Sequence, residues 1–568
     1  MTVENPSVDA APTPLETQQE TNAGVARATG VLALGNIASR VLGLAREIVI
    51  TNLFGATGAA AAYRVAVVVP KALYDLLIGG HVNSAIIPVL SEVVTVQGRD
   101  ALWRLVSVLM SLITCMLALL VLALVVFAPQ VVHLVGGGYS EPTLQLATDL
   151  LRLTAPALIF LSLFAVFSGT LYALRMFTWP AFAGVVFNGS IVLIALTFAP
   201  APQIQGVFTS GAGGLPVEWI SARPAEGIIV VALGWLGGAL AQLALQLPGL
   251  RGANLRFTVN WRHPALRRIV LLYMPVMFSL IIDTLVIRLV SYNLASQTGD
   301  SGINYMELAT TLIQFPQGLI ATAISIAILP TLSRQAVLVS DEGRTAFRDT
   351  LGLGLRLAIT MILPATIGLF VLARPIILLL FQHGAFTTAD TAMTVMALRL
   401  YLFGLPFAAL DLLLVYAFYA RQDTLTPAVI GLVSLTLYML VAVLLFPRFG
   451  LFSLMIADSL KHMLHALLST FLLARRLAGF GPQRLLLTFA KAGAAAAVMG
   501  LTGWFLLPYA EQMIGTSGLI REMLLVVALG SLSIVLYLGL AVLLRIEELR
   551  WLAQLLRKRF YPANAETG

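Results

Sequence analysis

Ionisable side chains lie within the first apolar segments of this chain, where they are costly because hydrocarbon does not solvate charge. In segments 26–51 and 59–90 these side chains are Arg40, Arg46, Glu47, Arg64, Lys71 and Asp75. Segment 266–294 adds Asp283 and Arg288. Among these six side chains of the first two segments, cations outnumber acids by four to two, so pairing alone leaves positive charge over.

The spacing of the second group predicts a polar stripe on one helix face. Arg64, Lys71 and Asp75 stand at i, i+7 and i+11, within about 40° of one another, and Lys71 and Asp75 can also pair. One interpretation is that ion pairs between helices fix their packing. The other is a hydrated cationic cavity for an anion, since Arg binds phosphate oxygens through a planar fork and Lys as a point charge. The surplus of cations favours the cavity.

The cavity interpretation assigns a role to each of these side chains. Binding of a phosphate or diphosphate is assigned to Arg40, Arg46, Arg64, Lys71 and Arg288. Orientation of these cations, or gating, is assigned to Glu47, Asp75 and Asp283. The sequence has no phosphate-binding loop and no zinc-protease motif. We therefore expect no catalytic residue, no metal and no enzymatic activity, with a membrane-embedded enzyme as a remote alternative.

The composition indicates the environment of these charges. Of 568 residues, 59% are hydrophobic and 11% charged, whereas soluble domains carry about 25% charged residues. This excludes a chain of soluble domains and predicts a polytopic membrane protein. The single cysteine, Cys115, excludes a disulfide framework. The net charge of +8 suits cytoplasmic loops better than a nucleic-acid site.

The apolar segments predict an all-α fold with about fourteen transmembrane helices. Segments long enough to cross roughly 30 Å of hydrocarbon lie near 26–51, 59–90, 103–128, 146–172, 177–199, 226–247, 266–294, 304–331, 352–373, 391–418, 427–446, 450–473, 485–508 and 520–544. Arginines gather in alternate connections, at 247–268, 332–351, 474–484 and the C-terminus. Cytoplasmic loops carry this excess, so both termini are predicted to be cytoplasmic.

The sequence also contains an internal repeat. Residues 84–92 (SAIIPVLSE) match 326–334 (IAILPTLSR), and the pairs Arg152-Leu, Tyr172-Ala and Pro180-Ala recur 247 positions later. Convergent Pro-Leu-Ser turns are the alternative explanation. Six helices fit in one period, which predicts two parallel lobes related by a pseudo-two-fold, with a site between them. The predicted units are a disordered cytoplasmic tail (1–25), two six-helix lobes (26–250 and 251–480), two further helices (481–545), and a cytoplasmic interfacial helix and tail (546–568).

Two other features permit alternative interpretations. Segment 450–473 contains Asp458, Lys461, His462 and His465, which could relay protons or simply pack at a helix interface. Segment Glu547–Phe560 sets leucines against basic residues, a pattern typical of an interfacial amphipathic helix.

Several motifs resemble the MurJ (MviN) family, the lipid II flippases of the multidrug/oligosaccharidyl-lipid/polysaccharide exporter superfamily. They are Ser39–Ile48 (SRVLGLAREI), Phe54-Gly-Ala, Pro70, Ala85–Glu92, Phe381–Thr387 (FQHGAFT) and Phe418–Pro427 (FYARQDTLTP). The resemblance covers roughly residues 26–510. It implies fourteen helices, two lobes around a cationic cavity that opens to alternate sides, and a groove for the lipid tail at helices 13 and 14. It matches Arg40 and Arg46 to the family's first-helix arginines, and Glu47 stands where an acid is usual.

The sequence departs from that pattern at other charged positions. Family charges of the second and eighth helices fall here on Tyr74, Ala61, Thr310, Thr311 and Gln314. Our hypothesis is that Lys71, Arg64 and Arg288 restore positive charge from other positions. The sodium site of some family members is not carried over, because segment 427–446 has no carboxylate.

The resemblance and the charge pattern together predict a function. We expect a flippase that moves undecaprenyl-pyrophosphate-linked peptidoglycan precursor across the plasma membrane by alternating access. Another lipid-linked glycan, a small molecule, or a non-transporting scaffold role in cell-wall synthesis are the alternatives. We expect a monomer without cofactor, driven by membrane potential or an ion gradient. Its expected partners are membrane lipids, the precursor and other cell-wall synthesis proteins, but not nucleic acid.

Overall fold

The predicted spans correspond to helices in a computed structural model that describes residues 14–77, 80–199, 223–259, 288–338, 340–477 and 479–549, with isolated positions between 261 and 287. Within those residues there is no β-strand, as the all-α prediction requires. The helices of the first half are α1 (Pro14–Phe54), α2 (Gly58–Leu77), α3 (Gly80–Gln97), α4 (Arg99–Val126), α5 (Ala128–Gly136), α6 (Glu141–Thr154), α7 (Ala157–Ala173), α8 (Thr178–Ala181), α9 (Ala183–Phe198) and α10 (Ile228–Ala244).

The second half repeats this order and adds a pair of helices. Its helices are α12 (Arg288–Ser296), α13 (Gly302–Pro316), the π-helical segment η5 (Gln317–Thr322), α14 (Ala323–Ala336), α15 (Asp341–Val371), α16 (Ala373–Phe381), α17 (Thr388–Leu402), α18 (Leu405–Ala420), α19 (Leu425–Phe449), α20 (Phe452–Arg476), α21 (Leu485–Ile514) and α22 (Leu519–Leu543). Most of the predicted span 266–294, including Asp283, lies outside the described residues.

Eight helical segments of the described chain are long and apolar enough to cross a membrane. A ninth crossing follows if α17 and α18, which meet at a 44° bend, form one span. The other predicted spans contain shorter, broken or more polar helices, such as α2 and α3. These helices make the chain a multi-pass membrane protein, while the count of fourteen transmembrane helices stays a prediction.

One predicted unit differs at the N-terminus. We expected residues 1–25 to be disordered, but α1 already begins at Pro14. The sequence that follows, LETQQE, consists mainly of strong helix formers, and proline is tolerated in the first helical turn. Helical propensity therefore extends the first membrane helix into the tail. The predicted interfacial helix Glu547–Phe560 lies mostly outside the described residues.

The internal repeat is visible in the lengths and turns of the helices. Helices α5 and α16 have nine residues each and begin 245 positions apart. Arg175 and Gln422, 247 positions apart, both adopt a left-handed backbone, with φ of 59° and 58°. Non-glycine residues seldom adopt this conformation, so the same sharp turn has been kept in both halves.

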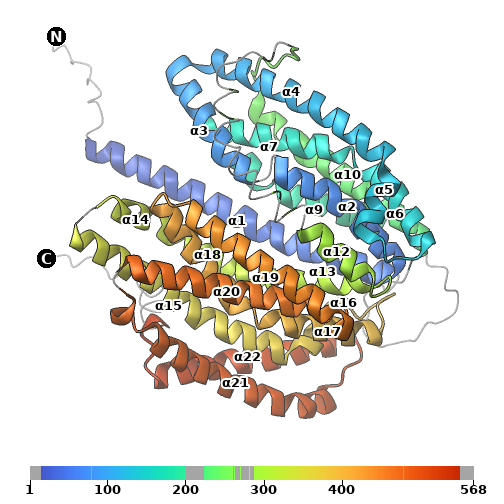
Figure 1. Ribbon diagram of the computed structural model, residues 1–568, viewed down its shortest axis with the longest axis vertical. Helices are drawn as coiled ribbons and strands as arrows, with labels where there is room; N and C mark the ends of the chain where they lie inside the picture. Colours follow the sequence, from blue (N-terminus) through green and yellow to red (C-terminus); the bar gives the residue numbers. More distant parts are fainter. Residues whose placement is uncertain are drawn as a thin grey trace, which may run out of the picture.

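The helices gather into two groups with α1 running between them (Figure 1). In the first lobe, α9 packs against α1 and α10, and α6 against α2. Ala60, Ala61 and Ala62 of α2 are at most 1% exposed, and their small side chains let neighbouring helices approach closely. In the second lobe, α20 packs against α17, α18 and α19. Helix α21 lies outside both lobes, against α15 and α22.

The two lobes are joined by hydrogen bonds near the end of α1, at a surface that we call the lobe junction. Asp300 of the second lobe accepts hydrogen bonds from Ser140 Oγ at 2.8 Å, from the Ser140 backbone N–H at 3.2 Å and from Thr143 Oγ1 at 2.7 Å. Ala385 N–H donates to Asn52 O at 2.9 Å. Asp300 thus caps the start of α6 across the junction, where a carboxylate also interacts favourably with the helix dipole.

The hydrogen bonds of Asp300 change its acidity. Partial burial acts to raise the pKa of its carboxyl group, but the hydrogen bonds from Thr143 and Ser140 outweigh it and lower the pKa below its ordinary value. The ionised form therefore favours the closed junction at neutral pH. That contribution is lost as the pH falls through the lowered pKa.

We predict that Asp300→Asn opens the lobe junction. Hydrogen bonds to a charged group contribute about 1.5–3 kcal/mol, so the separated population should rise about 10-fold or more. The distance between spin labels at Gln145→Cys and Gln297→Cys, in a Cys115→Ser background, measures that population.

The exposed carboxylate of Asp149, also on α6, provides the control, because its ion pair is with Arg152 of the same helix, at 3.2 Å. Asp149→Asn should leave the distance distribution unchanged. Acidification below the ordinary range of aspartate should open the junction in the unsubstituted chain but not further in Asp300→Asn. An Asp300→Asn junction as closed as the original would contradict this role of Asp300.

Candidate functional site

A buried carboxylate organises the charges at the start of the chain. Glu47 of α1 forms ion pairs with Arg46 at 2.7 Å and with Arg64 of α2 at 2.9 Å. The side chains of Glu47 and Arg64 are each 8% exposed, and that of Arg46 is 20% exposed. One acid is therefore shared by two guanidinium groups, so pairing leaves one positive charge in excess in this group, the Glu47 cluster (Arg46, Glu47 and Arg64).

Two asparagines complete the Glu47 cluster. Arg46 Nη1 donates to Asn188 Oδ1 of α9 at 3.0 Å, and Arg64 Nε donates to Asn304 Oδ1 of α13 at 2.7 Å. Asn304 Nδ2 in turn donates to the carbonyl oxygen of Thr57 at 3.1 Å. Arg64 thus links the first lobe to the second by a buried hydrogen bond.

A second ion pair joins the lobes and is open to water. Arg288 Nη1 of α12 lies 3.5 Å from Asp75 Oδ2 of α2, and both side chains are more than a third exposed. The sequence allowed Asp75 to pair with Lys71, whereas its ion pair in the structure is with Arg288. At this distance and exposure the pair is weak, because water screens it.

Lys71 has no ion pair within the part of the chain that the structure describes. Its side chain is exposed although α2 lies within the protein, so it faces a space that water can enter. The charged groups that interact with it through space are Arg288, Glu307, Asp75 and Arg46. Lys71 is therefore a free ammonium among charges from both lobes.

Arg40 reaches from α1 to the second lobe. Its Nη1 donates to the backbone carbonyl oxygen of Gln314 in α13 at 3.2 Å. The guanidinium group covers Gly318 in the π-helical segment η5, where a Cβ atom would lie 2.2 Å from Arg40 Cζ. Only glycine leaves room for this contact, and the π-helical turn alters the regular backbone hydrogen bonding beside it.

The sequence interpretation missed three polar residues of this centre. Glu307 of α13 accepts a 2.5 Å hydrogen bond from Tyr292 Oη. Glu307 carried the same signal as the others, a carboxylate within an apolar segment, but it was not selected. Asn188 and Asn304 carried no comparable signal, because neutral amides are common on buried helix faces.

The described charges between the lobes form a set that we call the central cationic site: Arg40, Arg46, Arg64, Lys71, Arg288, Glu47, Asp75 and Glu307. Five cations and three carboxylates leave two positive charges in excess. Some charges are paired, as the packing interpretation holds, yet the set as a whole stays cationic. The role of each residue in binding remains a prediction, and the predicted site residue Asp283 lies outside the described residues.

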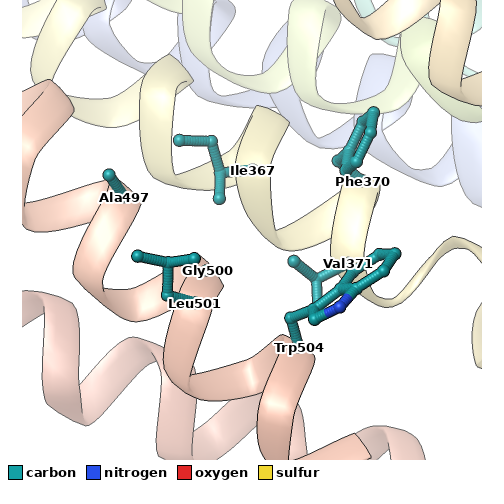
Figure 2. A pocket seen from close by; sticks show the side chains of 7 residues that line it. All are labelled: Ile367, Phe370, Val371, Ala497, Gly500, Leu501 and Trp504. Atoms are coloured by element: carbon teal, nitrogen blue, oxygen red, sulfur yellow. The ribbon is translucent and has the colours of Figure 1, made fainter.

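An apolar pocket of about 470 Å³ lies between α15 and α21 (Figure 2). It is lined by Ile367, Phe370, Val371, Ala497, Gly500, Leu501 and Trp504. Arg399 of α17 lies between the rings of Phe370 and Trp504, 5.1 and 5.3 Å from their centres. The close packing of α15 against α21 requires glycine at position 500, since a Cβ atom on Gly500 would lie 2.4 Å from Ile367 Cγ2.

Ion pairs hold the added helices against the second lobe at both ends. Arg374 pairs with Glu511 of α21 at 2.7 Å, and His383 lies 3.3 Å from Glu522 of α22. At the other end Arg356 of α15 pairs with Glu548 at 2.8 Å. The pocket is therefore framed by fixed contacts rather than by a loosely attached helix pair.

Comparison with known proteins identifies relatives over most of the chain. The family model described as lipid II flippase MurJ matches residues 50–525. A lipid II flippase MurJ of Burkholderia cenocepacia is 29% identical over 478 residues, which cover 82% of this chain and 87% of that protein. A probable lipid II flippase MurJ of Haemophilus influenzae is 29% identical over 490 residues, which cover 84% of this chain and 91% of that protein.

Solved structures agree on the fold. The inward closed conformation of a lipid II flippase MurJ covers 90% of this chain and 98% of its own, with a TM-score of 0.72 and 22% identity. An inward-facing MATE multidrug transporter of the MOP superfamily covers 78% of this chain and 96% of its own, with a TM-score of 0.60 and 13% identity. The family match extends over most of the sequence and includes the motifs that first suggested it, except Ser39–Ile48, which precedes the matched residues. This chain belongs to the lipid II flippase MurJ family.

Proposed function

We propose that this protein moves lipid II, the undecaprenyl-pyrophosphate-linked peptidoglycan precursor, from the inner to the outer leaflet of the plasma membrane. The observation that carries the proposal is the uncompensated positive charge of the central cationic site in a chain of this family. The polar head is the costly part to move, because each unpaired polar group in hydrocarbon costs several kcal/mol. A hydrated cationic site between the lobes lowers that barrier.

The diphosphate binds where the charge is free. Lys71 has no ion pair among the described residues, and Arg46 keeps a fifth of its side chain exposed. These groups offer charge-assisted hydrogen bonds to phosphate oxygens. Glu47 holds the guanidinium groups in place and offsets their repulsion when no substrate is bound.

Closure of the lobe junction defines one state of an alternating-access cycle. With the N-terminus cytoplasmic, α1 ends at the outer surface, so the junction closes the outer side and the cavity opens inward. Opening of the hydrogen bonds at Asp300 then releases the head outward as the lobes rock about the site. This cycle needs no covalent chemistry and no cofactor, and one chain suffices. Membrane lipids and other cell-wall synthesis proteins are its further partners.

The lipid tail stays in hydrocarbon and occupies the pocket between α15 and α21. Its lining is apolar throughout, and Leu501 and Trp504 are about half exposed, at 59% and 47%. A tail held there remains continuous with the bilayer while the head crosses. The ion pairs that fix α21 and α22 keep this surface in register with the second lobe.

Another lipid-linked glycan is a second candidate substrate. Where other family members carry charges, Thr310 and Thr311 donate to the carbonyl oxygens of Met306 and Glu307 in their own helix. They add no charge to the central site, so the contacts to the head group differ from the family's usual set. Translocation of labelled lipid II in proteoliposomes, competed by other polyprenyl-linked glycans, separates the two substrates. Preferred transport of another glycan would overturn the lipid II assignment.

We predict that Lys71→Ala and Arg64→Ala differ in their effects on stability. Loss of a charge-assisted hydrogen bond costs about 1.5–3 kcal/mol, so Lys71→Ala should slow lipid II translocation about 10-fold or more. Its thermal unfolding should hardly change, because no ion pair is broken. Arg64→Ala should lower both the translocation rate and the thermal stability, because removing one partner of a buried ion pair costs about 3–5 kcal/mol.

Translocation in proteoliposomes and thermal unfolding in detergent measure the two effects. Lys491→Ala, which removes a lysine of α21 away from the site, serves as the control and should match the unsubstituted protein. Normal translocation by Lys71→Ala would show that this ammonium group does not hold the diphosphate.

We also predict that Ala497→Phe blocks the tail pocket. Ala497 is exposed and lines the pocket, so an added ring fills space without a buried clash. Translocation should fall at least several-fold while thermal unfolding stays unchanged. Val498→Phe places the same ring on the neighbouring, exposed position of α21 outside the lining, and should translocate normally. Equal activity of the two variants would exclude the pocket from tail binding.

A further inference from the structure

A group of titratable side chains lies inside the second lobe, apart from the central cationic site. Asp411 belongs to α18, and the others follow one another on α20: Asp458, Lys461, His462 and His465. None of them is needed for the lipid binding described above. Ionisable residues are rare inside membrane-spanning helices and usually mark ion or proton pathways.

His465 and Asp411 form a hydrogen-bonded pair between two helices. The Nδ1 atom of His465 bonds to Asp411 Oδ1, and Ser469 Oγ lies 3.4 Å from the same nitrogen. Their side chains are only 13% and 15% exposed. Because a carboxylate accepts only, Nδ1 carries the hydrogen and Nε2 is the atom that gains or loses a proton. Nε2 faces α19 at Gly431, where a Cβ atom would lie 3.8 Å from it, an ordinary contact distance.

The remaining charges of the cluster are one acid and one base on α20. Lys461 Nζ lies 2.6 Å from Asp458 Oδ1, and His462 Nε2 lies 3.8 Å from Asp458 Oδ2. With both histidines neutral, two carboxylates face one ammonium group, so the cluster has a net charge of −1. An uncompensated charge in a low-dielectric lobe is costly. Binding of a single proton makes the cluster neutral.

Helices α17, α18 and α19 pack against α20. Their described residues contribute few other titratable groups to this cluster. From α17, Tyr401 interacts with Asp458; from α18, Tyr419 interacts with Asp411. From α19, the Tyr438 ring lies 5.6 Å from Lys461 Nζ. These are phenols, so within the described part of the chain Asp411, Asp458 and Lys461 carry the charges that the histidines meet.

Two tyrosines connect the cluster to the helices of the central cationic site. Tyr438 Oη lies 2.6 Å from Ser291 Oγ of α12, the helix that begins at Arg288. Tyr401 interacts electrostatically with Thr310 and Glu307 of α13. A change of charge at α20 therefore bears directly on the contacts of α12 and α13, which face the first lobe.

We propose that the second lobe contains a proton-binding site, formed by His465 and Asp411 and balanced by Asp458 and Lys461, whose occupancy shifts the equilibrium between the two lobe arrangements. A proton from water binds His465 Nε2 and is released to water when the lobes rearrange. The proton is the ligand that this pair fits, because His465 Nδ1 is engaged by Asp411 and leaves Nε2 as a proton acceptor. The proposal goes beyond lipid transport and can be tested without lipid.

The test measures lobe movement and protonation in the purified full-length chain in lipid nanodiscs. Spin labels at Val96→Cys and Val337→Cys, in a Cys115→Ser background, report the separation of the lobes opposite the lobe junction. Both positions are highly exposed, at 76% and 74%, and they stand at the ends of the repeat-related helices α3 and α14. The distance is compared at pH values between about 5 and 8, where histidine titrates and Asp300 stays ionised.

We expect the distance distribution to shift with pH in the otherwise unsubstituted chain and to lose that shift in His465→Gln. Asp411→Asn, which keeps the shape of its side chain, serves as a second variant if His465→Gln does not fold, and it too should lose the shift. His133→Gln, at an exposed histidine of α5, is the matched control and should keep it.

Imidazole NMR signals identify the titrating group independently. The imidazole signal that is absent from His465→Gln and present in His133→Gln should respond to pH in this range. The proposal is overturned if that signal does not titrate, if the chain shows no pH-dependent shift, or if His465→Gln and Asp411→Asn shift as the original does. Because no readout uses lipid II, failure of lipid transport and failure of this proposal are distinguishable.

Discussion

The arrangement of the lobes depends on one buried carboxylate that two guanidinium groups share. Glu47 balances only one of Arg46 and Arg64, so the protein keeps a cationic centre. Asn188 accepts a hydrogen bond from Arg46 and Asn304 accepts one from Arg64, so each guanidinium group has a polar partner besides Glu47. The same contacts fix α1, α2, α9 and α13 relative to one another. The Glu47 cluster therefore provides the excess positive charge and also fixes the relative positions of these helices.

Free charge and fixed charge are separated in space around that cluster. Arg64 is buried and fully engaged, whereas Lys71, further along α2, is exposed and unpaired among the described residues. Arg288 and Asp75 form a weak, hydrated pair. The buried pair of Glu47 and Arg64 fixes the helices without using the exposed charges of Lys71 and Arg288.

Much of this was predictable from the sequence, and the limits are specific. Hydrophobic runs located the helices, and the repeat predicted two similar halves; the matching turns at Arg175 and Gln422 are seen only in the structure. Charge inside apolar segments selected Arg40, Arg46, Glu47, Arg64 and Lys71. The second-lobe partners of Arg40, Arg64 and Asp75 were not predictable, because these contacts join residues more than two hundred positions apart. Arg288 rather than Lys71 pairs with Asp75 for this reason, and the packing of Arg40 on Gly318 requires the π-helical turn.

The repeat also explains how nearly equivalent halves produce a junction that can open. In the second lobe, Thr387 caps α17, and Asp390 three residues later completes the capping box within the same lobe. The equivalent helix α6 of the first lobe begins after Ser140 and has Thr143 where an acid would be needed. Its missing carboxylate is supplied by Asp300 from the other lobe. One helix start is therefore satisfied permanently and the other only while the lobes are closed, so loss of a single acid from the repeat converts a structural cap into a reversible contact.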